Sequence, residues 1–521
     1  MSPLSGQSAA IVGSGFGGLS TACYLADAGA DVTVLEQNEQ VGGRASRLER
    51  NGFAFDMGPS WYLMPDVFER FFADFDREPT DYYSLERLDP HYRIFFKDNA
   101  GERPEQSVPG LHASPNGDTV DVTPDREQVK RVFEAYESGA GDALDDYLAK
   151  SRENYEVGME HFVYEDRPRL RDWLDPDLAR YARGLSLLGT MQDHVEGYFE
   201  HPKLQQIMQY TLVFLGGAPN TTPALYNLMS HVDFNLGVYY PRPVEGATAS
   251  MGGIHAVARG MADVAEELGV EFHTNHSVTA IKGQRGGFKV DTDGETGSVL
   301  ADVVVSNADY AHTEQVLLPP EKRQYSEDYW ASRTYAPSAF LLYLGVEGDV
   351  DPLAHHTLVL PSNWNEHFGQ IFDDPEWPDD PAYYLCVPSE TDDDVAPAGH
   401  STLFVLVPIA PDLEDTPEIR ERYRDLILDD VAEHTGVDLR DRIVTEEAFT
   451  VSDFAERYNS YAGSALGLAH TLRQTAMFRP SHRSSEVDGL YFTGSYTTPG
   501  IGVPMCLISG DITANYVVAD A

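Results

Sequence analysis

The chain is poor in positive charge, and only seven of its 521 residues are lysines. Lysine and arginine together number 37 against 84 aspartates and glutamates, so the formal net charge at pH 7 is −47. A surface this acidic repels polyanions, which excludes nucleic acid and makes anionic lipid headgroups poor general partners. The acidic residues are scattered along the whole sequence, and we interpret this pattern as adaptation to a salt-rich cytoplasm, where ions screen the repulsion.

Cysteine is also scarce. Cys23, Cys386 and Cys506 lie far apart and show no metal-ligand spacing, so the sequence predicts no metal site. No apolar run approaches the roughly 20 residues that a membrane-spanning helix needs. The N-terminus lacks a basic segment followed by an apolar stretch, as an export signal would have. We therefore expect a cytoplasmic protein that does not cross the membrane.

Glycine, in contrast, is concentrated near the N-terminus. An apolar run at 10–12 leads into Gly13, Gly15, Gly17 and Gly18, and helical spacing continues from there to Gly29. Gly13 permits a tight turn, Gly15 lets the backbone approach a phosphate, and Gly18 lets the helix pack closely on the strand. The N-terminus of such a helix presents free N–H groups to an anion. The pattern predicts a strand, a turn and a helix that hold the pyrophosphate of a dinucleotide.

An acidic residue follows at the distance this interpretation requires. Residues 32–35 form a second apolar strand, and Glu36 comes at its end, where a carboxylate accepts hydrogen bonds from ribose hydroxyls. Glycine-rich turns also occur in ordinary loops. Here the glycines, the strand, the helix and the acid are all in register, which favours the dinucleotide site.

Further α/β segments return late in the chain. A helix is expected at 254–268, short strands at 271–273, 278–282, 288–292 and 303–306, and a last strand and helix after Gly489. We predict an α/β fold with a discontinuous Rossmann-like domain formed by residues 1–60, 246–315 and 480–521. An α+β substrate-binding domain formed by residues 61–245 and 316–479 is inserted between these pieces.

The segments after Glu36 resemble those of two-domain flavoproteins, the group that contains amine oxidases, protoporphyrinogen oxidase and carotenoid desaturases. Gly42-Gly43-Arg44 resembles their second glycine motif, and residues 55–60 continue the match. The resemblance implies FAD as the cofactor. It also implies that Gly43 and Arg44 lie along the pyrophosphate and ribityl chain, that the segment with Gly58 and Ser60 passes beneath the flavin ring, and that the backbone of Val278 meets the adenine.

The C-terminal run 489–505 is similar to the closing signature of bacterial-type phytoene desaturases and their relatives. Tyr239-Tyr240-Pro241, Met251-Gly252-Gly253 and Arg479-Pro480 agree with it. The resemblance adds Gly494, Ser495, Gly502 and Val503 to the expected FAD contacts, at a second helix N-terminus. Two features depart from the pattern: many amine oxidases of this group have an acid where Ser495 stands, and residues 242–250 form a longer turn than expected.

The resemblance implies an oxidoreductase acting on CH–CH groups, which moves a hydride from a polyene to the flavin while a neighbouring carbon loses a proton. The catalytic residues stay open. Asp56, His231 and Asp233 are candidates for the proton acceptor, and each has a structural role as the competing interpretation. The apolar segments 61–72 and 207–234 suit a substrate channel, although most of their residues also suit an ordinary core. Lysine-dependent amine oxidation finds little support, because no lysine occurs in the closing segment.

Within this family, residues 57–65 look closest to haloarchaeal carotenoid 3,4-desaturases of bacterioruberin synthesis. That similarity implies 3,4-desaturation of a prenylated, hydroxylated C45–C50 intermediate. The alternatives are a phytoene desaturase that forms lycopene, and a non-redox escort protein for prenyl lipids with the same fold. An apolar carotenoid substrate predicts peripheral attachment to the inner face of the cell membrane. The sequence does not identify the electron acceptor.

Overall fold

A parallel sheet holds the two ends and the middle of the chain together. The computed structural model describes residues 2–97, 107–173, 189–212 and 216–521. The sheet has the strand order β10-β2-β1-β14-β20, and all neighbouring strands are parallel. Its strands are β1 (Ser8–Val12), β2 (Asp31–Leu35), β10 (Glu271–His273), β14 (Val303–Ser306) and β20 (Leu490–Phe492).

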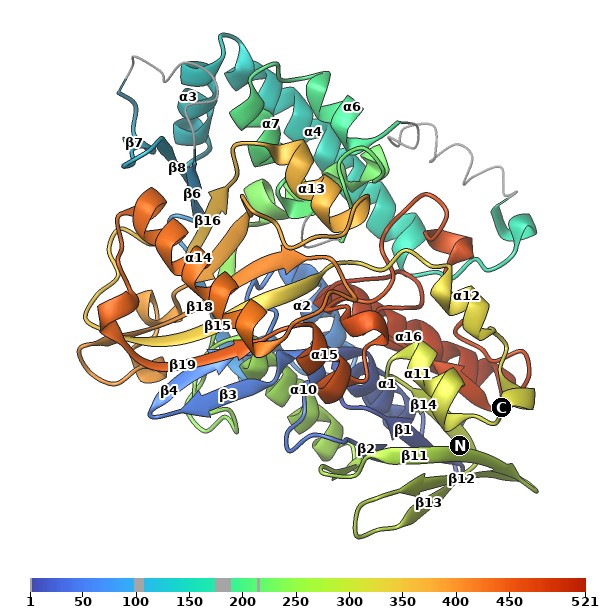
Figure 1. Cartoon of the computed structure of the whole chain (residues 1–521). Coiled ribbons are helices and arrows are strands. Elements are labelled where there is room, and N and C mark those ends of the chain that lie inside the picture. Colours follow the sequence, from blue (N-terminus) through green and yellow to red (C-terminus); the bar gives the residue numbers. More distant parts are fainter. Residues whose placement is uncertain (1, 98–106, 174–188, 213–215) are drawn as a thin grey trace.

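Both faces of the central strands β1 and β14 are buried, which explains their nearly continuous apolar runs. Ala9 and Ile11 of β1 join one core, formed with helices α1 (Phe16–Asp27), α10 (Ile254–Glu267) and α16 (Val503–Asp520). Ala10 and Val12 face the opposite core. That side is covered by the antiparallel sheet of β11 (Val278–Gln284), β12 (Gly287–Thr292) and β13 (Ser298–Ala301), at the bottom of Figure 1.

A larger mixed sheet lies on the left side of the molecule in Figure 1. Its strand order is β19-β15-β18-β17-β16-β6-β8-β7. The strands are β6 (Tyr92–Phe96), β7 (Leu111–Ala113), β8 (Asp118–Val122), β15 (Ser338–Glu347), β16 (His356–Leu360), β17 (Tyr383–Cys386), β18 (His400–Ile409) and β19 (Ile443–Phe449).

Helices cover both faces of the large sheet. Along β15, Phe340, Leu342 and Leu344 pack toward α14 (Pro417–Thr435), while Leu341 and Tyr343 point into the opposite core. This second core also receives apolar side chains from α3 (Arg126–Tyr136), α4 (Ala140–Gly158), α6 (Met191–Glu196) and α7 (Pro202–Gln209). Successive residues of a strand point to opposite faces, so an apolar run such as 339–346 satisfies both cores.

Short elements connect the two sheets. Two antiparallel pairs lie between them, formed by β3 (Arg47–Arg50) with β4 (Phe53–Asp56) and by β5 (Tyr83–Arg87) with β9 (Tyr239–Pro243). The other α-helices in the described parts of the chain are α2 (Pro65–Ala73), α9 (Leu228–His231), α11 (Tyr310–His312), α12 (Glu327–Ala331), α13 (Trp364–Phe372) and α15 (Val451–Tyr458).

The predicted elements of the parallel sheet agree with the structure to within a few residues. The last helix, expected after Gly489, begins at Val503, where Pro504 fits the first turn of a helix and Gly502 just before it has a φ of 123°. Residues 213–215 of the predicted apolar segment 207–234 lie outside the described residues. The α/β fold class is confirmed, and the domain boundaries stay a prediction.

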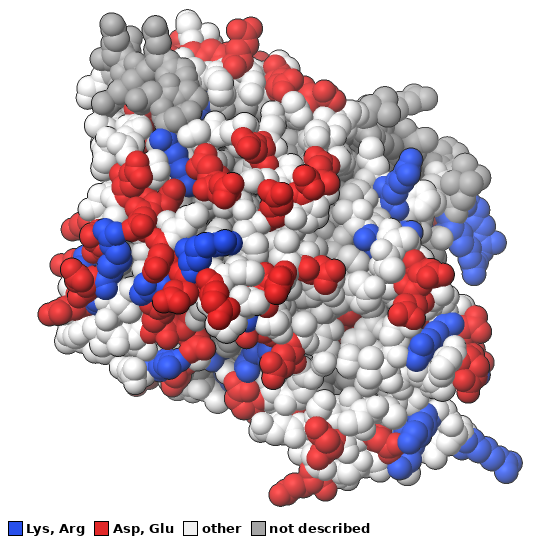
Figure 2. Space-filling model, viewed as in Figure 1, with Lys and Arg blue, Asp and Glu red and all other residues white. Residues whose placement is uncertain are grey.

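Carboxylates are distributed broadly over the surface. Figure 2 shows them over most of the visible face, densest near α14 and the adjacent strands, with the basic side chains interspersed. This distribution agrees with the scattering seen in the sequence. Within the part of the chain that the structure describes, no helix combines the length and the apolar character that a membrane span requires.

Candidate active site

The turn between β1 and α1 has the form that the glycine pattern predicts. Gly13 has a φ of 91°, in the left-handed region that favours glycine. A Cβ on Gly18 would lie 2.1 Å from the carbonyl oxygen of Gly13, so only glycine fits there. Gly15 caps α1 without a side-chain hydrogen bond, and the first turn of the helix carries no acidic residue. The backbone N–H groups in the first turn of α1 therefore remain available to an anion.

Three distant segments of the chain meet at this turn. A Cβ on Gly17 would lie 2.6 Å from Oδ1 of Asn307 and 3.0 Å from Cα of Gly494. Asn307 follows β14, and Gly494 follows β20, so both come from the carboxyl edge of the parallel sheet. The sequence analysis missed Asn307. Its position directly after a strand that neighbours β1 is the signal that identifies it.

Glu36 is buried at the end of β2. Its Oε2 accepts hydrogen bonds from the Ser14 backbone N–H (2.8 Å) and hydroxyl (2.7 Å), and Oε1 accepts one from the Asn38 N–H (2.8 Å). These bonds hold the carboxylate beside the glycine turn. Oε1 accepts a second bond from Nδ2 of Asn38 at 3.1 Å, so each oxygen already accepts two bonds. A ribose hydroxyl at Glu36 would replace one of these donors.

The second glycine motif packs directly on the first. The Gly42 N–H donates to the Ser14 carbonyl at 3.0 Å, and a Cβ on Gly43 would lie 3.1 Å from Cα of Gly15. Arg44 donates through Nη2 to the Ser460 hydroxyl at 2.9 Å. Its Nε is buried and has no hydrogen-bond partner among the described residues. A buried donor of this kind is costly unless a ligand accepts from it.

The segment 58–60 runs along the next part of the wall. A Cβ on Gly58 would lie 2.8 Å from the carbonyl oxygen of Arg44, which explains the glycine. Ser60 is buried, and its hydroxyl shares a 2.8 Å hydrogen bond with the hydroxyl of Tyr384 from β17. Tyr384 is a second residue that the sequence analysis missed, because its segment reads only as a buried strand.

The closing segment 494–502 is held by a buried arginine. The Arg479 guanidinium donates to five backbone carbonyls, those of Leu468, Gln474, Ser495, Tyr496 and Thr497. Burial lowers the pKa of Arg479 to about 10. His470 accepts a 3.1 Å bond at Nε2 from the Ile501 N–H, so its Nδ1 carries the proton and donates to Tyr226.

All of these segments border one cavity of about 850 Å³. Every site residue predicted from the sequence lines it except Gly18, which lies behind the wall, in contact with Gly13. The lining set comprises Gly13, Gly15, Gly17, Glu36, Gly43, Arg44, Gly58, Ser60, Val278, Gly494, Ser495, Gly502 and Val503. The structure thus brings the predicted residues together, and their individual contacts with FAD stay a prediction.

The cavity continues beyond the glycine-rich part into an apolar region. Its walls there include Trp61, Leu63, Met64, Met159, Phe162, Leu225, Leu228, Met229, Leu341, Leu406 and Phe454. The predicted channel segments 61–72 and 207–234 therefore divide into two groups. Some of their residues line the cavity, namely Trp61, Leu63, Met64, Leu225, Leu228 and Met229. Others belong to the cores and do not line it, namely Phe68, Phe71, Phe72 and Ile207. No lysine lines the cavity in the described parts of the chain.

The three candidate proton acceptors occupy different places. Asp56 accepts bonds from the N–H groups of Ile254 and His255 at the start of α10, and burial raises its pKa to about 6. His231 is bonded to Asn235, and burial lowers its pKa. Neither lines the large cavity. Asp233 does line it.

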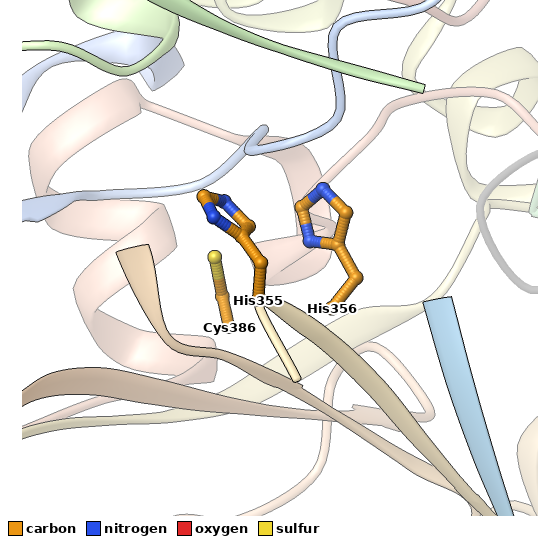
Figure 3. A group of neighbouring side chains, drawn as sticks. All are labelled: His355, His356 and Cys386. Carbon is orange, nitrogen blue, oxygen red and sulfur yellow. The ribbon is translucent and has the colours of Figure 1, made fainter. Parts of the chain in front are cut away.

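His355, His356 and Cys386 form a cluster (Figure 3), and a small pocket lined by His355 and Cys386 also borders Ser60. One potential ligand atom from each lies within 4.8 Å of the others, and all three side chains are buried. The cysteine spacing had not predicted this group. His356 shares a 2.6 Å bond at Nδ1 with Tyr384, and its ring stacks on Trp61 at 4.2 Å between centroids. His355 shares a 2.6 Å bond with Thr391. The cluster thus holds Tyr384 and, through it, Ser60.

The arrangement fits FAD. The glycines leave space that a side chain would fill, Glu36 lies at the strand end where a ribose is expected, and the buried Nε of Arg44 lacks an acceptor among the described residues. Two helix N-termini, those of α1 and α16, border the same cavity. The apolar extension leaves room for a substrate beside the cofactor.

Comparison with known families agrees with this geometry. Residues 16–518 match the family of flavin-containing amine oxidoreductases. The chain belongs to this family, and it is an oxidoreductase with FAD as its cofactor, as expected from the glycine motifs. Among solved structures, the cyclohexylamine oxidase from Brevibacterium oxydans has the same fold, with a TM-score of 0.56 at 15% identity over 98% of this chain and 99% of that one.

More specific similarity comes from curated relatives. The chain is 64% identical to the carotenoid 3,4-desaturase of Haloarcula japonica, over 100% of both chains. It is 32% identical to the zeta-carotene-forming phytoene desaturase of Myxococcus xanthus, over 97% of this chain and 92% of the relative.

Proposed function

We propose that the protein is an FAD-dependent carotenoid 3,4-desaturase, acting on a prenylated, hydroxylated C45–C50 intermediate of bacterioruberin synthesis. The observation that carries this proposal is the 64% identity to a carotenoid 3,4-desaturase along the full length of both chains. The apolar cavity supports it, because a polyene offers no polar group for most of its length. The intact glycine cradle argues against a non-redox escort protein.

FAD, when bound, supplies the two-electron oxidant that takes up a hydride from the substrate. The chain contributes position and a dry environment. Residues 58–61 and the apolar wall align the polyene along the cavity, and the buried Arg479 fixes the segment 494–502. The absence of a lysine from the described lining argues against lysine-dependent amine oxidation.

We further propose the domain division predicted from the sequence. Each strand of the parallel sheet comes from residues 1–60, 246–315 or 480–521, and each strand of the large sheet comes from residues 61–245 or 316–479. This separation of the two sheets supports an FAD-binding domain with an inserted substrate-binding domain.

We also propose a cytoplasmic protein that attaches peripherally to the inner face of the cell membrane. Leu472 and Phe478 are each 58% exposed and line the cavity, so they lie at its mouth. Exposed apolar side chains at the mouth of an apolar cavity suit the uptake of a lipid-soluble substrate. Arg473, exposed between them in the sequence, adds positive charge to an otherwise acidic surface.

Vesicle flotation tests the attachment. Replacing Leu472 and Phe478 by serine is expected to release the protein from phospholipid vesicles at high salt. Leu300→Ser is the matched control, because Leu300 is 64% exposed on β13 and does not line the cavity. Equal flotation of the double variant and the wild type would contradict the proposed surface.

Deleting the gene in a pigmented host tests the function. The expected result is accumulation of the prenylated, hydroxylated intermediate, with restoration of the final pigment on re-introduction of the gene. Accumulation of phytoene would identify the protein as a phytoene desaturase instead, the function of the relative from Myxococcus xanthus.

A further inference from the structure

Asp233 is a buried carboxyl group in the wall of the apolar cavity. It lies in the helical turn Val232–Leu236 and is 2% exposed. Its Oδ2 accepts hydrogen bonds from the hydroxyls of Tyr92 (2.9 Å) and Tyr210 (2.7 Å). Oδ1 has no hydrogen-bond partner among the described residues. Both tyrosines bind the same oxygen, so Oδ1 is left without a partner in the described part of the chain, enclosed in the wall with almost no accessible surface.

The surroundings connect this carboxyl to the flavin side of the cavity. The ring of Trp61 lies 5.5 Å from that of Tyr92 and 6.2 Å from that of Tyr210, measured between centroids. Trp61 directly follows Ser60, in the segment expected beneath the flavin ring. The carboxyl therefore borders the part of the cavity where a polyene carbon and the flavin ring would meet.

The proton affinity of Asp233 suits a base at neutral pH. Burial raises the pKa of Asp233 to about 7, and the two tyrosine hydrogen bonds act in the opposite direction. Among the described residues, the titratable groups that contact the carboxyl are Tyr92 from β6 and Tyr210 just beyond the end of α7. A general base works best with a pKa near the working pH.

We propose that Asp233 is the proton acceptor of the desaturation, an inference that rests on the proposed function. One substrate carbon loses a hydrogen with its electron pair to the oxidised flavin. The neighbouring carbon loses its hydrogen as a proton, which forms an O–H bond with Oδ1 of Asp233 after a small rotation of the carboxyl group brings that oxygen to the cavity surface. The electron pair of that second C–H bond becomes the new C=C bond, and the two tyrosine hydroxyls stay bonded to Oδ2.

Asp233→Asn tests the proposal with little disturbance of the fold, because the amide oxygen can still accept both tyrosine bonds. The expected kcat falls by at least about 100-fold, with little change in KM. Glu314→Gln is the matched control. Glu314 is also buried, with a pKa raised by burial to about 7, but it does not line the cavity. Its removal is expected to leave kcat unchanged.

Infrared titration gives a readout that does not depend on turnover. In the flavin-loaded protein without substrate, the infrared band of protonated carboxyl groups should contain one component from Asp233 and one from Glu314, both titrating near neutral pH. Asp233→Asn should remove the first component, and Glu314→Gln should remove the second. Tyr210→Phe removes a bond that lowers the pKa, so the midpoint for Asp233 should rise by about one pH unit. The pH at which kcat falls on the acid side of its pH profile should increase by the same amount.

These outcomes distinguish the role of Asp233 from the proposed function. A wild type that holds FAD but leaves the carotenoid unchanged overturns the proposed function, and the assignment of Asp233 with it. An active wild type with an equally active Asp233→Asn overturns the assignment alone. The assignment also fails if Tyr210→Phe raises the infrared titration midpoint of Asp233 but leaves unchanged the pH at which kcat falls on the acid side.

Discussion

Among single residues, Gly18 has the tightest steric requirement in the cofactor cradle. Its missing Cβ would lie 2.1 Å from the backbone oxygen of Gly13, and backbone cannot rotate away. Gly18→Ala should therefore push α1 off the turn, cost about 1–3 kcal/mol of stability and weaken FAD binding. Thermal unfolding and flavin fluorescence measure the two effects.

Gly369→Ala is the control for that substitution. Gly369 lies inside α13, and a Cβ there would meet nothing within 4 Å. Alanine favours the helix, so stability should rise by up to about 1 kcal/mol and FAD binding should not change. Equal behaviour of the two variants would show that the Gly18 contact is unimportant.

Asp233 should also leave a pH signature on stability. Burial raises its pKa in the folded protein to about 7, above the value of about 4 expected in the unfolded chain. The folded protein holds the proton more tightly, so the associated stability is present at low pH and lost as the pH rises through about 7. Relative to that of Asp233→Asn, the free energy of unfolding of the wild type should fall by about 2 kcal/mol between pH 5.5 and pH 8. A difference that does not vary with pH would contradict the raised pKa.

These residues also show how far a site can be predicted from sequence. Gly13, Gly18 and Glu36 were predictable because one local strand–turn–helix unit contains their partners. Asn307 was not, because its partners are glycines from both ends of the chain. Asp233 was one of three candidates, and only its position in the cavity wall distinguishes it.

At the level of elements, the segment that leads into α16 depends on Arg479. The guanidinium reaches five carbonyls in two stretches of chain, 468–474 and 495–497. Lysine has three donors and no planar fork, so it cannot bridge the same set. Arg479→Lys should lower the free energy of unfolding by about 2–3 kcal/mol and accelerate FAD release.

Arg473→Lys provides the comparison in the same loop. Arg473 is exposed, so its replacement should leave both the melting temperature and the rate of FAD release unchanged. If Arg479→Lys released FAD no faster than Arg473→Lys, the buried arginine would not be what fixes the closing segment.

Elements were easier to predict than their pairing. The strands of the parallel sheet are short apolar runs, and the structure places them within a few residues of the expected positions. The large sheet could not be ordered in advance, because β6 pairs with β16 across more than half of the chain. Nothing in either local sequence specifies such a partner. The spacing of apolar residues shows which face of a helix or strand is buried, whereas the order of strands in a sheet depends on how the elements pack together.

At the scale of the whole molecule, the net charge of −47 makes stability depend on salt. The Debye length falls from about 8 Å at 0.15 M salt to about 3 Å at 1 M. Screening of the acidic surface should therefore raise the melting temperature between these two KCl concentrations. Sucrose is the control, since it favours compact states without screening charge. A melting temperature that rises equally in sucrose and in KCl would contradict the electrostatic explanation.

The central claim concerns the substrate, and an assay with the purified, FAD-loaded protein tests it most directly. The prenylated, hydroxylated carotenoid and phytoene are supplied separately in lipid vesicles at high salt, and the products are identified by mass and absorption spectra. We predict that the first substrate loses two hydrogens at carbons 3 and 4 and gains one conjugated double bond, while phytoene is returned unchanged. Conversion of phytoene with no change in the prenylated carotenoid would contradict the proposed 3,4-desaturation.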